Sequence, residues 1–344
     1  MTAASAAPLT VSVVLCTHNG AAFIAEQLAS ILAQRPAPIE IVLGDDDSRD
    51  GTVDIVERLV ADARATDPDT APELVVRRHS PALGVTANFA DAIAHARGEL
   101  IALSDQDDIW MPDKLAVVVD RFAHDSRLTL VHSDARLIDG ASSPLGGTLL
   151  EALEITTQEK VDLVAGNAQT ALLRRNLVTG ATVVFRRELL EHALPIPSQW
   201  VHDEWLAAVA AGMSQHAGAV RLMPRPLIDY RQHDANQIGA RRPSLGDRWA
   251  RLTEPRDERQ PWLAERTRLL AERLRERGAP AARLARAEAK HAHEAARAEY
   301  PAARLLRIPA VVGAAVRGHY ARYSRGGIDI VRDLLQPATR GGER

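Results

Sequence analysis

Short apolar runs alternate with helix-patterned segments through the first hundred residues of the chain. Four runs rich in β-branched residues and leucine have the length of buried strands, at residues 11–16, 39–43, 74–76 and 100–103. Between them, apolar residues recur at three- and four-residue spacing in segments 23–32, 53–60 and 85–97, with Gly98 as the expected stop of the last. This alternation predicts an α/β fold, with a mostly parallel sheet flanked by helices.

Polar clusters directly follow the first, second and fourth predicted strands. They are Thr17-His18-Asn19, Asp45-Asp46-Asp47-Ser48 and Asp105-Gln106-Asp107-Asp108. Ligands of parallel sheets bind beyond the carboxyl ends of the strands. We therefore expect the three clusters to converge at one edge of the sheet, although they are far apart in sequence.

The composition is that of a globular protein, with 344 residues of which 46% are hydrophobic and 25% charged. Cys16 is the only cysteine, so the chain cannot form an internal disulfide, and its apolar neighbours predict a buried residue. Residues 1–240 hold 19 Lys+Arg and 32 Asp+Glu, a net charge of −13, whereas residues 241–344 hold 23 and 13, a net charge of +10. This asymmetry predicts two regions, an acidic domain over 1–240 and a basic helical region over 241–344.

The chemistry of the first region must rest on carboxylates, because the glycine motifs of nucleotide sites are absent. No Gly-x-Gly-x-x-Gly follows the first strand and no Gly-x-x-x-x-Gly-Lys-Ser/Thr occurs, which argues against a Rossmann dehydrogenase and a P-loop ATPase. Asp105 and Asp107 place two oxygen ligands on one turn, an arrangement suited to Mg²⁺ or Mn²⁺ shared with a diphosphate. Aspartate-rich turns also occur as solvated loops or helix caps, but Trp110 and Pro112 directly after this cluster favour a binding site.

The three motifs together resemble those of the family 2 glycosyltransferases with the GT-A fold. The matching segments are residues 11–20, 41–52 and 102–115, and the resemblance covers residues 10–240. The form Ser104-Asp105-Gln106-Asp107-Asp108-x-Trp110, and Tyr230-Arg231-Gln232-His233 followed by Asn236, are similar to a bacterial branch containing rhamnosyltransferases of cell-surface polysaccharide synthesis. The family implies an inverting transfer of a sugar from a nucleotide sugar to an acceptor hydroxyl.

The resemblance also implies roles for single residues on the donor side. Thr17 and Asp46 would hold the base and ribose, with Asp45 as a second candidate and Asn19 beside them. The metal and diphosphate would lie on Asp105 and Asp107, with His233 as a third metal or phosphate contact and Arg231 on the diphosphate. The alternatives are a surface histidine at 233 and an Arg231–Asp229 ion pair. The sequence departs from the family pattern at Asp47, where glycine or asparagine is usual, and at Asp234-Ala235 after His233.

A base must accept the proton of the acceptor hydroxyl in such a reaction. The family places it at an acidic residue opening a late helix, which corresponds to Asp203, with Glu204 as second choice. Asp203 would otherwise serve only as the cap of a helix over 203–211. Acceptor-side candidates are Gly180 and Thr182, in a segment that is expected to enter a strand from a tight loop, together with Trp205 and Trp110.

The basic C-terminal region has its own helical pattern. Residues 244–300 predict a helical hairpin broken at 278–280, and residues 305–335 place apolar side chains among arginines. A cationic helix with an apolar face can lie on an anionic membrane. Packing onto the catalytic domain or forming a homodimer are the alternatives. No nucleic-acid-binding motif is present, so nucleic acid is not expected as a partner.

The sequence thus predicts a metal-dependent inverting hexosyltransferase, with dTDP-rhamnose as the expected donor and a lipid-linked or polysaccharide hydroxyl as the acceptor. A transferase using a UDP-sugar and a non-catalytic nucleotide-sugar-binding module are the alternatives. The start of the chain lacks the pattern of a signal peptide, and no apolar run is long enough to span a membrane, so we expect a cytoplasmic enzyme or one peripheral on the inner face of the plasma membrane.

Overall fold

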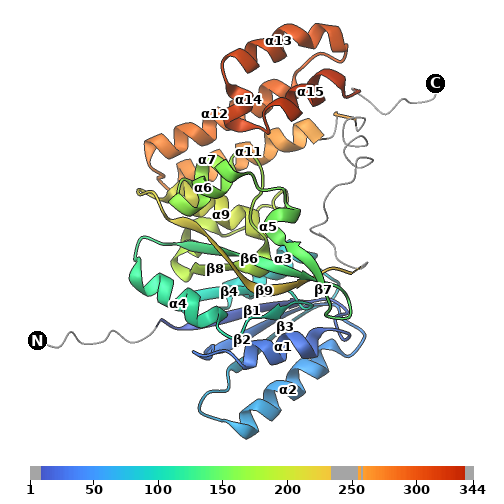
Figure 1. Cartoon of the computed structure of the whole chain (residues 1–344), viewed down its shortest axis with the longest axis vertical. Coiled ribbons are helices and arrows are strands. Elements are labelled where there is room, and N and C mark those ends of the chain that lie inside the picture. The colour runs from blue at the N-terminus through green and yellow to red at the C-terminus, as the bar shows by residue number, and fades with distance from the viewer. Residues whose placement is uncertain (1–8, 234–254, 257–258, 338–344) are drawn as a thin grey trace, which may run out of the picture.

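The computed structural model describes residues 9–233, 255–256 and 259–337 of the chain (Figure 1). Its strands are β1 (Val11–Thr17), β2 (Glu40–Asp46), β3 (Glu73–His79), β4 (Leu100–Ser104), β5 (Ile109–Trp110), β6 (Leu130–Ile138), β7 (Pro144–Thr148), β8 (Val183–Arg186) and β9 (Val220–Arg231). They form one sheet in the order β3-β2-β1-β4-β8-β6-β9-β5, with β7 paired to β6. The predicted α/β class is confirmed.

The first four strands are parallel neighbours, as the alternating pattern predicts. β1 lies between β2 and β4, and β3 extends the sheet beyond β2. The remaining strands are mixed: β8 runs antiparallel to β4 and β6, while β9 runs parallel to β6. The predicted entry from a tight loop is also present, because a 3₁₀ turn, η1 (Gly180–Thr182), leads directly into β8.

Helices cover both faces of the sheet, because successive strand residues point to opposite sides and both sides are apolar. The elements α1 (Ile24–Leu32), α2 (Thr52–Thr66) and α4 (Lys114–His124) pack on one face, with Val13 and Leu15 of β1. On the other face, α3 (Val85–Ala94) and α9 (His202–Met213) pack against Val14 and Cys16. The buried position of Cys16 agrees with the prediction.

Shorter helices fill the segment between β6 and β9. They are α5 (Leu149–Ala152), α6 (Thr157–Ala165), α7 (Ala168–Leu172), η2 (Arg187–Leu189) and α8 (Leu190–Ala193). The predicted helix over 85–97 ends earlier, at Ala94. Gly98 is not its stop but a point of close approach, since a Cβ there would lie 2.5 Å from the backbone nitrogen of Ser12.

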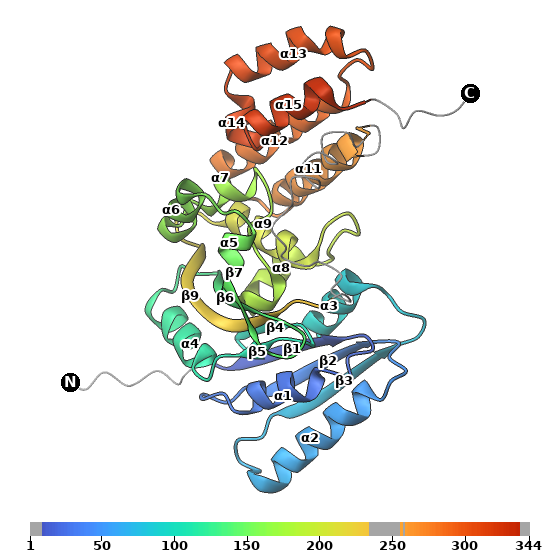
Figure 2. The ribbon, with the colours of Figure 1, turned by 45° about the vertical axis from the view of Figure 1, so that its right-hand side comes forward.

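The C-terminal region is helical, as expected, and extends away from the sheet (Figures 1 and 2). Its helices are α11 (Arg259–Glu276), α12 (Ala281–Ala298), α13 (Arg304–Val316), α14 (His319–Tyr323) and α15 (Gly327–Leu335). The predicted hairpin is α11 and α12, which turn at Gly278 with a φ of +71°. The expected boundary between residues 240 and 241 lies outside the described residues.

The two ends of this region pack differently. Leu270 and Leu274 of α11 and Ala287 of α12 belong to the same apolar core as α9. A separate small core joins α13, α14 and α15 through Val311, Ala314 and Tyr320. Among the described residues, no helix combines the length and the apolar character needed to span a bilayer.

Candidate active site

The three predicted polar clusters meet at the carboxyl edge of β1, β2 and β4. The side chain of Gln106 joins the first and third, because its Oε1 accepts a hydrogen bond from the His18 backbone N–H at 2.9 Å and its Nε2 donates to the His18 carbonyl at 3.1 Å. The backbone N–H of Asn19 donates to Ser48 Oγ at 2.9 Å, which joins the first and second clusters. The strand order therefore produces the convergence that the sequence predicts.

Thr17, Asp45 and Asp46 are buried at this edge and engaged with the protein itself. Thr17 Oγ1 donates to Asp45 Oδ1 at 2.7 Å. The two carboxylate oxygens of Asp46 accept the backbone N–H groups of Leu83 at 2.6 Å and Gly84 at 2.9 Å. These carboxylates hold the loops at this edge of the sheet, and a contact with a nucleoside would use their remaining lone pairs.

Asn19 lies beside them in a strained backbone position. Its φ is +48°, a left-handed conformation that asparagine tolerates better than most residues. Its Oδ1 accepts the backbone N–H of Arg49 at 2.9 Å, so the side chain fixes the loop after β2.

The loop after β4 concentrates negative charge in a buried place. Burial, then the charges of Asp107 and Asp203, raise the pKa of Asp105 to about 7. Burial and the neighbouring Asp107 and Asp105 also raise the pKa of Asp108 well above its usual range. Asp108 Oδ1 accepts the Arg231 backbone N–H at 3.0 Å, whereas Oδ2 is buried without a hydrogen-bond partner.

Lys114, at the start of α4, is the buried cation beneath this loop. Its Nζ donates to the Ala181 carbonyl at 3.0 Å and lies 3.8 Å from the centre of the Trp110 ring. Burial lowers the pKa of Lys114 to about 7, against the opposing effect of Asp108 and Asp105. One partly charged lysine does not balance three aspartates, so the loop retains an excess of negative charge that favours a cation.

Asp107 and His233 are the residues that present ligand atoms together. His233 Nε2 lies 2.8 Å from Asp107 Oδ2, and the His233 ring stacks on Phe23 at 4.7 Å between ring centres. Within residues 9–233, 255–256 and 259–337, no three histidine, cysteine, aspartate or glutamate side chains are grouped to hold a metal ion unaided. A carboxylate and an imidazole beside further buried carboxylates fit a Mg²⁺ or Mn²⁺ ion whose remaining ligands come from a diphosphate.

Arg231 is buried and engaged with the protein itself. It is 1% exposed, pairs with Glu26 at 2.6 Å and donates from Nε to the Asp107 carbonyl at 2.6 Å. Its Nη1 donates to Ser142 Oγ at 2.8 Å. The predicted partner Asp229 instead pairs with Arg136 at 2.6 Å. Arg231 therefore fixes the aspartate loop to its surroundings, and its contact with the diphosphate stays a prediction.

The two acidic residues that open α9 have different surroundings. Asp203 is 7% exposed, its Oδ1 accepts the Glu204 backbone N–H at 2.6 Å, and burial raises its pKa to about 7. Glu204 instead forms an ion pair with Arg266 of α11, and the Arg266 guanidinium stacks on Trp200 at 4.1 Å. Asp203 thus keeps a carboxylate near the aspartate loop, whereas the carboxylate of Glu204 is occupied by the C-terminal region.

Gly180 and Thr182 lie next to Asp203, in η1. A Cβ on Gly180 would lie 3.0 Å from His202 Nε2 and 3.5 Å from Asp203 Oδ2, so a glycine lets this turn approach the start of α9. The hydroxyl of Thr182 is buried and donates to the Thr179 carbonyl at 2.7 Å. Gly180 is close to the proposed base, while Thr182 stabilises the turn.

The two tryptophans predicted to line the acceptor side are core residues. Trp205 is fully buried and its Nε1 donates to the Ala193 carbonyl at 2.7 Å. Trp110 is 2% exposed and packs under Lys114. Neither offers surface to an acceptor, which corrects the prediction: helical and strand neighbours turn both rings inward.

Sequence reasoning missed Lys114 and Gln106. Lys114 is the first residue of an amphipathic helix, where a lysine normally extends into solvent. The one sequence feature that could have predicted its burial is the preceding loop, which contains aspartates and no basic residue. Gln106 lies between two aspartates that carry the expected chemistry. No sequence pattern shows whether such a residue bonds to a neighbouring loop or only separates the two aspartates.

Several known proteins are similar to this chain. The model of the family described as Glycosyl transferase family 2 matches residues 12–192, more than half of the chain. The dTDP-rhamnosyl transferase RfbG of Shigella flexneri is 27% identical over 66% of this chain and 74% of that protein. An uncharacterized glycosyltransferase of Nostoc sp. is 27% identical over 66% of each chain. The match spans 66% and 58% of the length of the first two curated relatives.

Solved structures show the same architecture. The mannosyltransferase PcManGT of Pyrobaculum calidifontis, in complex with GDP-Man and Mn²⁺, has a TM-score of 0.51 at 23% identity and covers 96% of this chain and 86% of that one. Residues 1–349 of TarS from S. aureus, in complex with UDP-GlcNAc, have a TM-score of 0.56 at 15% identity, covering 95% and 90%. These likenesses confirm the GT-A fold. Together with the family match across the strand-end motifs, they lead to one conclusion: the chain belongs to glycosyl transferase family 2.

Proposed function

We propose that the chain is an inverting, metal-dependent glycosyltransferase that transfers a hexose from a nucleoside-diphosphate sugar to an acceptor hydroxyl. The observation that carries this proposal is electrostatic proximity: the Asp203 carboxylate is close enough to the aspartate loop to raise the pKa of Asp105. This proximity supports a base on α9 that acts on a sugar whose diphosphate is bound at the aspartate loop.

The reaction uses the residues as follows. Asp203 accepts the proton of the acceptor hydroxyl, and the hydroxyl oxygen forms a bond to the anomeric carbon as the bond from that carbon to the diphosphate breaks. Attack opposite the leaving group inverts the configuration. Asp107 and His233, with Asp105 behind them, would hold a divalent ion, which stabilises the charge on the leaving diphosphate when bound.

We further propose dTDP-rhamnose as the donor. The support is the relative RfbG of Shigella flexneri, a dTDP-rhamnosyl transferase, which the chain matches over 74% of that protein's length. A saccharide on a lipid-linked or polysaccharide acceptor is consistent with the succinoglycan biosynthesis protein ExoU of Rhizobium meliloti, which is 30% identical over 54% of this chain and 52% of that protein. UDP-GlcNAc, bound by TarS, is the competing donor class.

A thermal-shift panel tests both statements. We expect dTDP-rhamnose with Mn²⁺ to raise the melting temperature more than UDP-GlcNAc or GDP-mannose, because ligand binding to the folded state stabilises it. In the native chain, Mn²⁺ should increase the thermal shift that the donor causes. In Asp107→Ala this Mn²⁺-dependent increase should disappear. The matched control is Asp54→Ala, at an exposed position of α2.

The panel separates the donor from the reaction class. A larger shift with another nucleotide sugar would replace the donor, while slow release of nucleoside diphosphate from that sugar would keep the class. No shift and no release with any nucleotide sugar, with or without Mn²⁺, would overturn the transferase mechanism.

A further inference from the structure

The outer helices of the C-terminal region carry exposed apolar side chains in unusual number. On α13, Leu305 is 79%, Val312 52% and Val316 82% exposed, and Ile308 lies between them in the same stripe. The opposite side of α13, with Val311 and Ala314, packs against its neighbours. Ile328, Val331 and Leu335 form a second exposed stripe on α15. α13 lies at the end of the molecule farthest from the sheet (Figures 1 and 2).

The charges around these stripes have one sign. Among residues 300–337, the exposed charged side chains are Arg304, Arg317 and Arg322, and Arg304 and Arg317 flank the α13 stripe along the chain. The two acidic residues of this segment point inward, since Asp329 is 4% and Asp333 0% exposed. The outer surface is therefore apolar and cationic, with no exposed carboxylate among these described residues.

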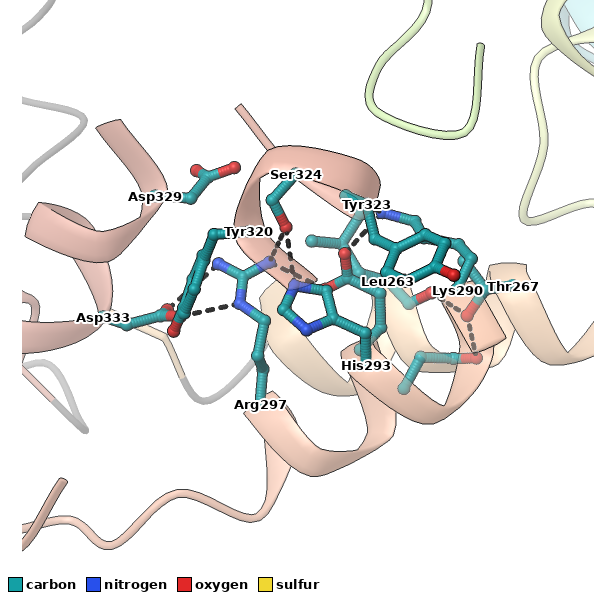
Figure 3. Close-up of polar contacts among 12 residues, drawn as sticks. Leu263, Thr267, Lys290, His293, Arg297, Tyr320, Tyr323, Ser324, Asp329 and Asp333 are labelled. Carbon is teal, nitrogen blue, oxygen red and sulfur yellow. Dashed lines mark hydrogen bonds and ion pairs between the residues drawn. The ribbon is translucent and has the colours of Figure 1, made fainter. Parts of the chain in front are cut away.

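Figure 3 shows what holds the acidic side chains inside. Asp333 accepts two hydrogen bonds from Arg297, from Nε at 2.7 Å and from Nη2 at 3.0 Å, and a third from the Tyr320 hydroxyl at 2.6 Å. Arg297 also donates to Glu294 at 2.8 Å, and Glu294 accepts from Lys290 at 2.5 Å. In this buried network the carboxylates are paired with arginine, lysine and tyrosine, and the network joins α12, α14 and α15 beneath the exposed surface.

We propose that this surface, called here the docking face and consisting of Leu305, Ile308, Val312 and Val316 with Arg304, Arg317 and Arg322, binds a membrane that contains anionic phospholipid. Apolar side chains would enter the headgroup boundary while the arginines pair with lipid phosphates. A symmetric contact between two copies is disfavoured, because both copies would bring arginines and no exposed carboxylate of residues 300–337 to the contact. The inference does not depend on the proposed donor or reaction.

Vesicle co-sedimentation of the full chain tests the proposal. We expect binding to vesicles of phosphatidylglycerol and phosphatidylcholine, weaker binding at high salt, and little binding to phosphatidylcholine alone. The double variant Val312→Glu/Val316→Glu should lower partitioning at least about tenfold, because it removes apolar contact and adds charge repelled by the lipid. Replacing one of the three arginines with serine should lower it about fivefold.

The matched control is Val161→Glu/Val164→Glu on α6, where the two valines are 53% and 39% exposed. It adds the same charge to a helix outside the docking face and should bind vesicles like the native chain. Circular dichroism and donor hydrolysis should be unchanged in both double variants. The proposal is overturned if the native chain ignores anionic vesicles or if the Val312/Val316 variant binds them as well as the control. It is equally overturned if analytical ultracentrifugation shows a native dimer that this variant dissociates without any vesicle binding.

Discussion

Asp203 and Glu204 show how two adjacent carboxylates acquire different tasks from their surroundings. Glu204 is neutralised by Arg266, so removing either partner would leave the other charge buried and unpaired. Asp203 has no cationic partner of this kind in the described structure, and burial raises its pKa to about 7. A raised pKa near neutrality is what a general base needs, and it also makes the residue costly to the fold.

Asp203→Asn should therefore lose transfer while gaining stability. We expect kcat to fall about 10²–10⁴-fold, the range for removing a general base, with donor-induced thermal shifts unchanged. The raised pKa means that Asp203 stabilises the fold below pH 4 and loses this contribution as the pH rises through about 7. Unfolding measured at pH 4 and pH 8 should show equal stability at pH 4 and a variant that is more stable at pH 8.

Glu204→Gln is the control at the adjacent position. It should keep transfer and lose stability, because Arg266 is left without its carboxylate. If Asp203→Asn retained transfer and Glu204→Gln lost it, Glu204 would be the catalytic base and Asp203 would not.

The sequence predicted the site residues whose chemical type alone indicates a function. It did not predict the orientation or burial of side chains, which depends on how distant segments pack. Aspartates at strand ends signal a cation or diphosphate site whatever surrounds them. The inward orientation of Trp205, the role of Arg231 and the burial of Lys114 depend on segments that lie far away in sequence, such as Glu26 and Ala181. No local pattern carries that information.

At the scale of elements, the aspartate loop is held from two sides. Gln106 links it to the end of β1, and Arg231 at the end of β9 donates to the Asp107 carbonyl. A loop supported in this way presents its carboxylates in a fixed arrangement, which lowers the entropic cost of binding.

Arg231→Met tests this support. We expect the Mn²⁺ concentration for half-maximal activity to rise about 10–100-fold, as is typical when groups supporting metal ligands are removed. The melting temperature should also fall, since buried carbonyls lose their donor. Arg225→Met, also on β9, is the control, because its solvent-exposed ion pair with Asp113 contributes little. An unchanged Mn²⁺ requirement in Arg231→Met would contradict the role.

Some strands were predictable from their own sequence and others were not. The parallel strands β1 to β4 were predictable because they are continuous apolar runs, a pattern typical of sheets that are covered on both faces. β9 carries Pro224 and Pro226, which normally disfavour a strand, and it pairs with β6 through shifts in register. β7 is exposed and contains Gly146 and Gly147 at positive φ. Such strands exist because neighbours pair with them, so their own sequence does not indicate them.

At the scale of the whole molecule, α13, α14 and α15 form a small unit whose apolar core is slight. Val311, Ala314 and Tyr320 are its fully buried apolar members, so the ion network around Asp333 contributes much of its cohesion. Asp333→Asn should destabilise this unit by about 3 kcal/mol, because the Arg297 charge is left incompletely paired.

Two spectroscopic signals can locate that loss. The five tryptophans are at positions 110, 200, 205, 249 and 262, outside α12 to α15. In urea, circular dichroism of Asp333→Asn should begin to fall before tryptophan fluorescence changes, while exposed Glu299→Gln should show coincident transitions. Coincident transitions in Asp333→Asn would mean that the unit does not unfold separately.

The packing of α11 against α9 has a consequence for how relatives can be recombined. A Cβ on Gly212 of α9 would lie 2.6 Å from a methyl of Leu274, and Arg273 donates to the Ala193 carbonyl at 2.9 Å. A crossover placed between the two helices would separate surfaces that fit one another closely. Chimeras that exchange substrate preference should therefore inherit α9, α11 and the helices that follow from one parent, because Arg297 of α12 is in turn paired with Asp333 of α15.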